Sequence, residues 1–393
     1  MAVNPGGRLA MTDVVGRTHE IARYWKVLER QSLVLGGERR IGKTHIVLKM
    51  HEEPREGFVT FFQELEKVHG VLELVRALYS AVGNHLPRLT RAKAKLIAAW
   101  DALLPTRYKD LELPTAKSNW KTLLETAMCD VLEAVDPKQR VVFLWDELPL
   151  MLFNILDREG ASTASERLDL LRHLRQVHGE RLRFLFNGSI GLHLVLRRLR
   201  TAGNTNAPIN DMYKDTVPPM RREEAEEVAR RGLRDLDPPP ARTDEDGIVA
   251  ALIDAIGGYP YFIQHVVDQL SLLGRAPTLA DVNHAIRGLL SADDDPAQLK
   301  YFVDRINTHY QATEAAQALA VLDAIAGQPK SLLLADVMNL ARHANEGWSD
   351  NDLKDTCSML REDHYLMVQD TGDHARYEFR WPLLKSWWKG NRL

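Results

Sequence analysis

The segment "SLVLGGERRIGKTHIVLKM", residues 32–50, constrains the fold more than any other part of the sequence. An apolar run typical of a buried strand leads into "GERRIGKT", and a helical pattern follows. Gly37 and Gly42 allow the backbone to turn so that successive N–H groups point to one place, where the start of a helix adds positive potential. We therefore predict that Gly37–Thr44, called the phosphate loop below, binds phosphate groups. A glycine-rich turn that only caps a helix is the alternative interpretation.

The chemistry of the loop indicates a nucleotide with a bound magnesium ion. Lys43 brings a cation to the β- and γ-phosphates, and the hydroxyl of Thr44 is a ligand for Mg²⁺. ATP and Mg²⁺ are therefore the predicted cofactors. The residues predicted to bind the nucleotide from this segment are Gly37, Glu38, Arg39, Arg40, Ile41, Gly42, Lys43, Thr44 and His45.

A second motif, "VVFLWDELP" at residues 141–149, is an apolar strand that ends in two adjacent acids. Asp146 is placed to hold Mg²⁺ through water, and Glu147 to act as the general base that activates the attacking water. An acidic pair that merely caps the following helix is the competing explanation. The presence of the phosphate loop upstream favours the catalytic interpretation.

A third strand, "RFLFNGS" at residues 183–189, ends in polar side chains. In parallel α/β sheets, ligands bind beyond the carboxyl ends of the strands. Asn187 or Ser189 is thus a candidate for sensing the γ-phosphate or orienting water, although an ordinary turn explains these residues equally well.

The order of patterns along the chain predicts an α/β fold, with a P-loop parallel sheet followed by two smaller domains. Apolar runs at 32–37, 58–62, 140–147 and 181–189 alternate with helical patterns, as in a parallel sheet covered by helices. After residue 217 the chain reads as helical, and a final stretch shows three helices and a hairpin around "DTGD", which suggests a winged helix. The predicted domains are 1–217, with a helical insertion at about 86–118, a helical lid at 218–300 and a winged helix at 301–393.

Composition narrows the class of protein. The chain has 393 residues, enough for two or three domains, and a net charge of −3, so no overall basic field attracts nucleic acid or an anionic membrane. Its two cysteines, Cys129 and Cys357, are far apart and lack metal-ligand spacing. No apolar run is long enough to span a bilayer. We expect a cytoplasmic protein without a membrane contact.

Taken together, these motifs resemble the STAND-type, AAA+-like ATPases, in particular the group called archaeal-type ATPases. The segment "VVGRTHEIARYW" is similar to the conserved start of that family, which implies that Gly16 and Arg17 line the base side of the nucleotide. The segment "GGYPYFIQ" is similar to the family's lid signature, which implies that Pro260 approaches the adenine. A helix break followed by a proline-initiated helix also explains "GGYP".

The C-terminal "YEFRWPLLKSWW" is similar to the aromatic end of the family's winged helix. Because Trp381, Leu384 and Trp388 repeat on one helix face, we interpret them as core residues. The resemblance implies an ATPase that acts as a nucleotide-gated switch, with Lys43, Glu147 and Asn187 as its catalytic residues.

One departure from the family pattern concerns an arginine that commonly follows the sensor strand. The corresponding stretch here is "APINDMYKD", with Asn210 and Asp211 where a basic residue is expected. Since an arginine finger accelerates phosphoryl transfer by orders of magnitude, we expect slow or partner-stimulated hydrolysis. The helix with Arg197, Arg198 and Arg200 offers substitutes, unless it is a solvated face.

The third helix of the predicted winged helix, residues 349–363, argues against duplex DNA as the partner. It contains five acidic and two basic residues, a net charge of −3, where a recognition helix faces phosphates. A protein partner that binds the winged helix or the insertion fits better, and an oligomer is left open. The basic cluster "RLTRAKAK", residues 88–95, is either a nucleic-acid contact or a solvated helix face. Two other functions stay open: a regulatory module with negligible turnover, and a DNA-loading ATPase.

Overall fold

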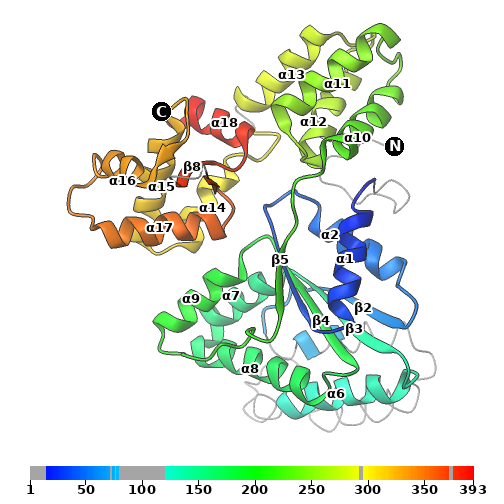
Figure 1. Ribbon diagram of the computed structural model, residues 1–393. Helices are drawn as coiled ribbons and strands as arrows, with labels where there is room; N and C mark the ends of the chain where they lie inside the picture. The colour runs from blue at the N-terminus through cyan, green and yellow to red at the C-terminus, as the bar shows by residue number, and fades with distance from the viewer. Residues whose placement is uncertain (1–14, 71–72, 76, 79–119, 292–294, 371–374) are drawn as a thin grey trace, which may run out of the picture. The chain divides into compact units, whose positions relative to one another are not determined.

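The computed structural model describes residues 15–70, 73–75, 77–78, 120–291, 295–370 and 375–393 (Figure 1). Its internal contacts divide the chain into two units. The sheet unit consists of Arg17–Gly36 and Lys43–Val217, and the helical unit of Gly37–Gly42 and Pro218–Leu393 with the segment that ends at Gly16. The predicted insertion at 86–118 and the basic cluster at 88–95 lie outside the described residues. The predicted domain boundaries stay predictions.

The sheet unit is built on five parallel strands in the order β2-β3-β4-β1-β5. Strands β3 and β4 are buried over nearly their whole length because neither side of an apolar, unalternating strand prefers water. The four predicted strands are therefore confirmed. The strands are β1 (Leu33–Gly36), β2 (Phe58–Glu64), β3 (Arg140–Asp146), β4 (Leu182–Asn187) and β5 (Tyr213–Thr216).

Strand β5 was not predicted from the sequence. Its residues, "YKDT", are polar, and the strand is short, half-exposed and paired only on the β1 side. Because its residues are polar, the strand has no apolar pattern in the sequence. Its position is set by main-chain pairing with β1 and by the ion pair of Asp215 with Arg23 at 2.6 Å.

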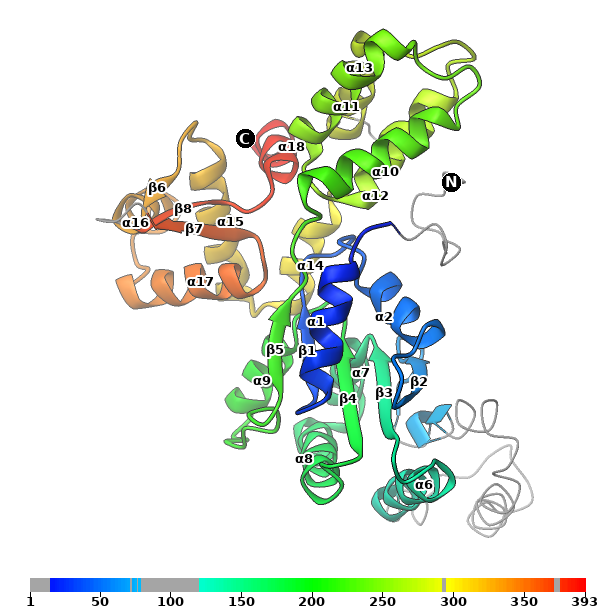
Figure 2. The ribbon, with the colours of Figure 1, turned by 45° about the vertical axis from the view of Figure 1, so that its right-hand side comes forward.

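Six described helices accompany these strands. The first helix packs on β1, and the second on β2 and β3, whereas α7 and α8 pack on β4 and on each other (Figure 2). The centre of the sheet is filled by aromatic rings, with Phe143 stacked 5.7 Å from Phe184. The helices are α1 (Thr18–Leu28), α2 (Lys43–Glu52), α6 (Trp120–Ala134), α7 (Leu148–Glu159), α8 (Ala161–Val177) and α9 (Leu192–Thr201).

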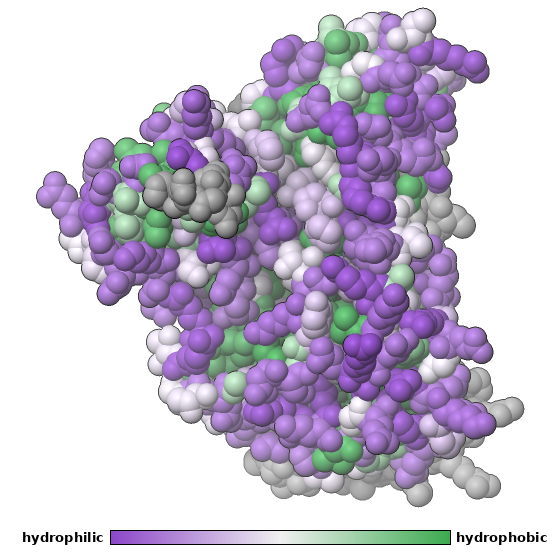
Figure 3. All heavy atoms as spheres, viewed as in Figure 1, coloured by the Kyte–Doolittle hydropathy of each residue, from purple (hydrophilic) through white to green (hydrophobic). Residues whose placement is uncertain are grey.

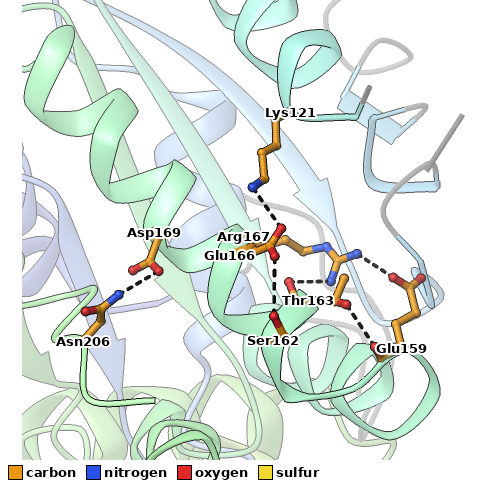
Figure 4. Close-up of polar contacts among 8 residues, drawn as sticks. All are labelled: Lys121, Glu159, Ser162, Thr163, Glu166, Arg167, Asp169 and Asn206. Carbon is orange, nitrogen blue, oxygen red and sulfur yellow. Dashed lines mark hydrogen bonds and ion pairs between the residues drawn. The ribbon is translucent and has the colours of Figure 1, made fainter. Parts of the chain in front are cut away.

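A cluster of polar contacts ties α6, α7 and α8 together (Figure 4). Arg167 of α8 is only 1% exposed and pairs with Glu159 at the end of α7 at 2.8 Å. The preceding residue, Glu166, forms an ion pair with Lys121 of α6 at 2.9 Å. A guanidinium buried this deeply is stable only with such partners, so the cluster fixes how these helices pack.

The helical unit begins with four helices that pack on one another. At the start of the first one, the backbone N–H of Arg221 donates to the carboxylate of Glu224 at 3.2 Å. The second of these helices ends before Gly257, and the third starts at Pro260, as expected from the helix break at "GGYP". These helices are α10 (Arg222–Arg234), α11 (Arg242–Ile256), α12 (Pro260–Ser271) and α13 (Leu279–Ser291).

The remaining elements contain the predicted three helices and hairpin. Strand β8 pairs antiparallel with both β7 and the short β6. The C-terminal helix packs on α11, α13 and α15, and Trp381, Leu384 and Trp388 are buried, as the core interpretation expects. The elements are α14 (Tyr301–His309), α15 (Ala312–Ala326), β6 (Leu332–Leu333), α16 (Leu334–Ala341), α17 (Asp350–Glu362), β7 (Leu366–Asp370), β8 (Ala375–Phe379) and α18 (Pro382–Arg392).

Hydrophilic residues predominate on the face of the molecule shown in Figure 3. None of the helices among the described residues is both long enough and apolar enough to cross a bilayer.

Candidate functional site

Three neighbouring strands carry the predicted motifs at their carboxyl ends. Strand β4 lies between β3 and β1, and Asn187 of β4 is level with Leu35 of β1. Strand β3 ends in Asp146, and β1 leads directly into the phosphate loop. The topology therefore brings the ends of the three strands to one edge of the sheet, where parallel α/β sheets bind their ligands.

Asp146 is the most unusual acid of the sheet unit. It is 3% exposed, and its Oδ1 accepts a hydrogen bond from the N–H of Glu147 at 3.1 Å. Burial, followed by the charge of Glu147, raises the pKa of Asp146 to about 6, against the opposing effects of Thr44 and Lys43. The structure thus places Thr44 and Lys43 near enough to the end of the acidic strand to act on Asp146, but burial and Glu147 outweigh their effect on its pKa.

Glu147 follows in a left-handed backbone conformation, with φ 59°, at the start of α7. Its carboxylate accepts hydrogen bonds from the N–H of Ser189 at 2.9 Å to both oxygens and from the Ser189 hydroxyl at 2.9 Å. From the sequence, Ser189 was a candidate for sensing phosphate. In the structure its donors hold the predicted general base, and no sequence signal pointed to that contact.

Asn187 has the surroundings expected of a ligand-binding side chain. It is 2% exposed, and neither its amide nitrogen nor its carbonyl oxygen has a hydrogen-bond partner among the described residues. Buried amide groups are nearly always hydrogen-bonded, so an unpartnered one requires an explanation. A phosphate oxygen or an attacking water would satisfy it, in accordance with the predicted role.

The backbone of the phosphate loop has the geometry that an anion cradle requires. Gly37 and Gly42 have φ angles of 137° and 99°, which favour glycine, and Arg40 lies in the left-handed region with φ 69°. Helix α2 begins at Lys43, which is 7% exposed. His45 lies in the first turn of this helix and is half-buried. The loop thus fits a bound phosphate group.

The variable side chains of the loop contact the rest of the helical unit. Glu38 is 3% exposed and lies 2.5 Å from the Nε of Arg380, and Tyr259 donates to it at 3.4 Å. The guanidinium of Arg40 lies 4.2 Å from the centroid of the Tyr261 ring and donates a hydrogen bond to Gln298 at 2.6 Å. Of the predicted loop, Gly37–Gly42 belong to the helical unit, whereas Lys43 and Thr44 belong to the sheet unit.

The residues expected from the lid and from the start of the chain are also placed. Pro260 occupies the first turn of α12, and its ring would lie 4.0 Å from a Cβ added to Gly42. The helix break at "GGYP" is therefore confirmed, whereas the approach of Pro260 to the adenine stays a prediction. Gly16 and Arg17 adopt left-handed backbone angles, and Arg17 is 3% exposed. Their contact with a nucleotide base stays a prediction.

The segment that departs from the family pattern is held by an ion pair. Arg175 of α8 donates to both carboxylate oxygens of Asp211 at 2.8 Å. Although burial opposes the effect, the hydrogen bond and charge of Arg175 lower the pKa of Asp211. Arg198, one of the suggested substitutes, instead pairs with Asp157 at 3.5 Å. Asp211 and Arg198 therefore each have an ion-pair partner within the sheet unit.

The acidic third helix of the C-terminal region needs one correction. Asp363, counted among its five acids, is 2% exposed and does not contribute to the helix surface. It accepts an ion pair from Arg305 and a hydrogen bond from Tyr310, each at 2.6 Å. Asp350 also pairs with Arg342 of the preceding segment. The surface of α17 is therefore less acidic than the sequence count indicates, and it repels the phosphates of duplex DNA less than the sequence predicts.

Solved structures with a similar fold cover nearly the whole chain. The Walker-type ATPase PABY2304 of Pyrococcus abyssi aligns over 98% of this chain and 99% of its own, with a TM-score of 0.62 and 14% identity. The ORC2 protein of Aeropyrum pernix, solved as ADPNP–ADP complexes, aligns over 94% of this chain and 92% of its own, with a TM-score of 0.53 and 13% identity. No family model and no curated protein matches the sequence. The chain therefore has a P-loop fold of the AAA+ kind, and the predicted fold class is confirmed.

Proposed function

We propose that this protein is a Mg²⁺-dependent ATPase of the STAND type that acts as a nucleotide-gated switch. The fold of AAA+ ATPases is the frame for this proposal, and the motifs at the edge of the sheet supply its chemistry. In this scheme the nucleotide state sets the position of the helical lid and the winged helix, and hydrolysis resets the switch.

The single observation that carries the proposal is the buried carboxylate of Asp146 at the end of β3. It is 3% exposed, and although Thr44 and Lys43 lower its pKa, burial and the charge of Glu147 raise it to about 6. Burying an acid without a full positive partner is costly unless a cation occupies the site during function. A hydroxyl and a carboxylate are oxygen ligands, the type that Mg²⁺ prefers.

Each residue of the site has a role in this proposal. The loop and Lys43 bind the phosphates, and Thr44 and Asp146 hold Mg²⁺, which neutralises charge on the phosphates when it is bound. Glu147 takes the proton of the attacking water, and the unpartnered amide of Asn187 orients that water or the γ-phosphate.

The second candidate is a regulatory module that binds nucleotide without appreciable turnover. The observation that favours it is the state of Glu147, whose two carboxylate oxygens both accept hydrogen bonds from Ser189. Hydrogen bonds that stabilise the ionised carboxylate make it a weaker base. Slow turnover, or turnover that a partner stimulates, follows from this geometry together with the missing arginine.

Two variants test the proposal and separate the candidates. Lys43→Ala removes the loop cation, and we expect nucleotide binding, measured by fluorescence of a labelled ADP, to be lost. Glu147→Gln should keep nucleotide binding but lower phosphate release from ATP by about 10²–10⁴-fold, the usual contribution of a general base. If wild type and Glu147→Gln release phosphate equally slowly while both bind nucleotide, the regulatory module is the correct reading. Unchanged binding by Lys43→Ala would contradict both.

The partner class is a separate part of the proposal. We propose a protein partner bound by the winged helix or the insertion, with a DNA-loading ATPase as the alternative, which the reduced acidity of the α17 surface leaves open. DNA binding through phosphates weakens steeply with salt. Duplex binding that is lost between low and physiological salt, and that depends on the basic cluster at 88–95, would favour the DNA-loading alternative.

A further inference from the structure

The phosphate loop contains a buried carboxylate, which is an unfavourable group for binding a polyanion. Glu38 is the second residue of the loop, and it is 3% exposed. A negative charge in a poorly solvated position repels phosphates over several ångströms because the effective dielectric constant there is low. Unless this charge is neutralised, the loop works against its own ligand.

Arg380 supplies a neutralising charge from a distant part of the sequence. Its Nε lies 2.5 Å from Oε1 of Glu38, and its side chain is 25% exposed. Both residues belong to the helical unit. The phenol of Tyr259 adds a donor at 3.4 Å, and burial is the main reason that its pKa is raised well above the usual range. Tyr259 therefore stays a hydrogen-bond donor to the carboxylate at neutral pH.

The position of Arg380 is fixed by its neighbours in the C-terminal region. Its backbone N–H donates to the carbonyl of Tyr365 at 2.9 Å, and one of its terminal nitrogens lies 3.2 Å from Nδ1 of His364. The next residue, Trp381, stacks on the ring of Tyr259 at a centroid distance of 4.8 Å and lies tilted against that of Phe262 at 4.4 Å. The position of the Arg380 guanidinium beside Glu38 is thus set by main-chain hydrogen bonding and by the aromatic rings that pack around Trp381.

Two more loop side chains point to the same conclusion. The guanidinium of Arg39 lies 3.7 Å from the centroid of the Tyr301 ring, and Arg40 lies over Tyr261 and donates to Gln298 at 2.6 Å. Cations in this position over aromatic rings are held by about 0.5–2 kcal/mol. Three consecutive loop residues are therefore held by the lid helices and the C-terminal region.

We propose that Arg380 is a positioning residue of the phosphate loop, and that it neutralises Glu38 so that the segment Gly37–Gly42 accepts phosphates. This inference rests on the proposed function, because it assumes that the loop binds a nucleotide. Its consequence is regulatory: a partner that moves the C-terminal region away from the loop also removes the charge that the loop needs, and so releases the nucleotide.

A double-mutant cycle on the full-length chain tests the proposal, with the dissociation constant of fluorescently labelled ADP as the readout. Arg380→Gln leaves Glu38 uncompensated, and we expect ADP affinity to fall about tenfold or more. Glu38→Gln combined with Arg380→Gln removes both charges, and we expect affinity to return to within about threefold of wild type. Urea denaturation of each variant separates the two roles, because a merely structural ion pair would change the free energy of unfolding and leave the ADP affinity of the folded protein unchanged.

Arg392→Gln is the matched control. Arg392 belongs to the same region, is 26% exposed and pairs with Asp323 at 3.0 Å, and its substitution should leave ADP affinity unchanged. The inference is overturned if Arg380→Gln binds ADP as wild type does, if the double variant binds no better than Arg380→Gln, or if Arg392→Gln weakens binding as strongly. Failure of wild type to bind ADP at all would overturn the proposed function itself, and so the two failures are distinguishable.

Discussion

Two buried aspartates, one in each unit, are treated in opposite ways by their surroundings. Asp363 in the helical unit is 2% exposed and receives a guanidinium and a phenol at 2.6 Å each. Asp146 in the sheet unit is 3% exposed and receives one backbone N–H, and burial and the charge of Glu147 outweigh the opposing charge of Lys43. The first carboxylate is neutralised by a guanidinium in direct contact, whereas the pKa of the second is raised.

This difference separates a structural acid from a functional one. A buried acid with a complete set of cationic and hydrogen-bonding partners stabilises one arrangement of its helices and needs no ligand. A buried acid without a full cationic partner costs folding free energy, and a cation bound during function offsets that cost. The two aspartates therefore make opposite predictions for the same chemical change, aspartate to asparagine.

The largest effect is expected for Asp363→Asn. This change leaves Arg305 as a buried charge with no carboxylate, and we expect the free energy of unfolding to fall by about 3–5 kcal/mol. Urea denaturation monitored by tryptophan fluorescence measures the loss. The control is Glu227→Gln, which breaks an exposed pair with Arg231 whose side chains are 44% and 48% exposed, and which should cost less than about 1 kcal/mol. Equal losses in both variants would contradict the structural role of Asp363.

The second prediction is that Asp146→Asn stabilises the nucleotide-free protein. The pKa of Asp146 is raised to about 6 from 3.8. Between these two values the folded protein holds a proton that the unfolded chain has released, so this group makes the protein less stable as pH rises through that window. Above pH 6 the penalty is complete, about 3 kcal/mol, and asparagine removes it. Urea midpoints in the presence of EDTA at pH 7.5 and pH 4 measure the difference.

At pH 4 the advantage of Asp146→Asn should nearly vanish, because the wild-type carboxyl is then protonated in the folded state. Phosphate release in the presence of Mg²⁺ should be lost in the same variant, since the amide is a poorer metal ligand. A variant that is less stable than wild type at pH 7.5 would show that Asp146 is a structural acid like Asp363, and the comparison between the two would fail.

Sequence reasoning recovered the parts of this molecule whose signal is local. The phosphate loop, the acidic strand and the sensor strand each combine an apolar run with polar residues at a fixed place, and all four predicted strands formed. Strand β5 was missed because its residues are polar and its position depends on pairing with β1. The pattern also set Asn187 at the edge of the sheet, but it could not show that both of its polar atoms lack a partner among the described residues.

The contacts that sequence reasoning could not supply join residues far apart in the chain. Glu38 and Arg380 are separated by more than three hundred positions, and neither belongs to a motif that names the other. Asp363 looked like a surface charge of an acidic helix, because its position at the end of α17 gives no indication of the arginine that reaches it from α14. Such pairings follow from tertiary packing, which a single sequence does not encode in any local pattern.

A third prediction concerns the close packing around the general base. A Cβ added at Gly188 would lie 2.7 Å from Cδ of Pro149 and 3.3 Å from Oε2 of Glu147. Because a proline ring cannot turn aside, Gly188→Ala should lower the free energy of unfolding by about 1–3 kcal/mol and displace Glu147. Gly247→Ala is the control, since it adds a methyl group with no atom within 4 Å on an exposed helix position and should stabilise by about 0.5–1 kcal/mol. Similar outcomes for the two would show that the strand end tolerates a side chain.

The smallest effect is expected for Ser189→Ala, and it decides what the hydroxyl contributes. The substitution removes one donor at 2.9 Å from Oε2 of Glu147, but the backbone N–H of residue 189 still reaches both carboxylate oxygens at 2.9 Å. We expect a stability loss of about 1 kcal/mol, and phosphate release within about threefold of wild type. Loss of activity as deep as in Glu147→Gln would mean that the hydroxyl acts on the nucleotide or the water itself. A retained activity instead assigns the hold on Glu147 to the main chain, which places control of the base in the backbone of the β4–α9 connection.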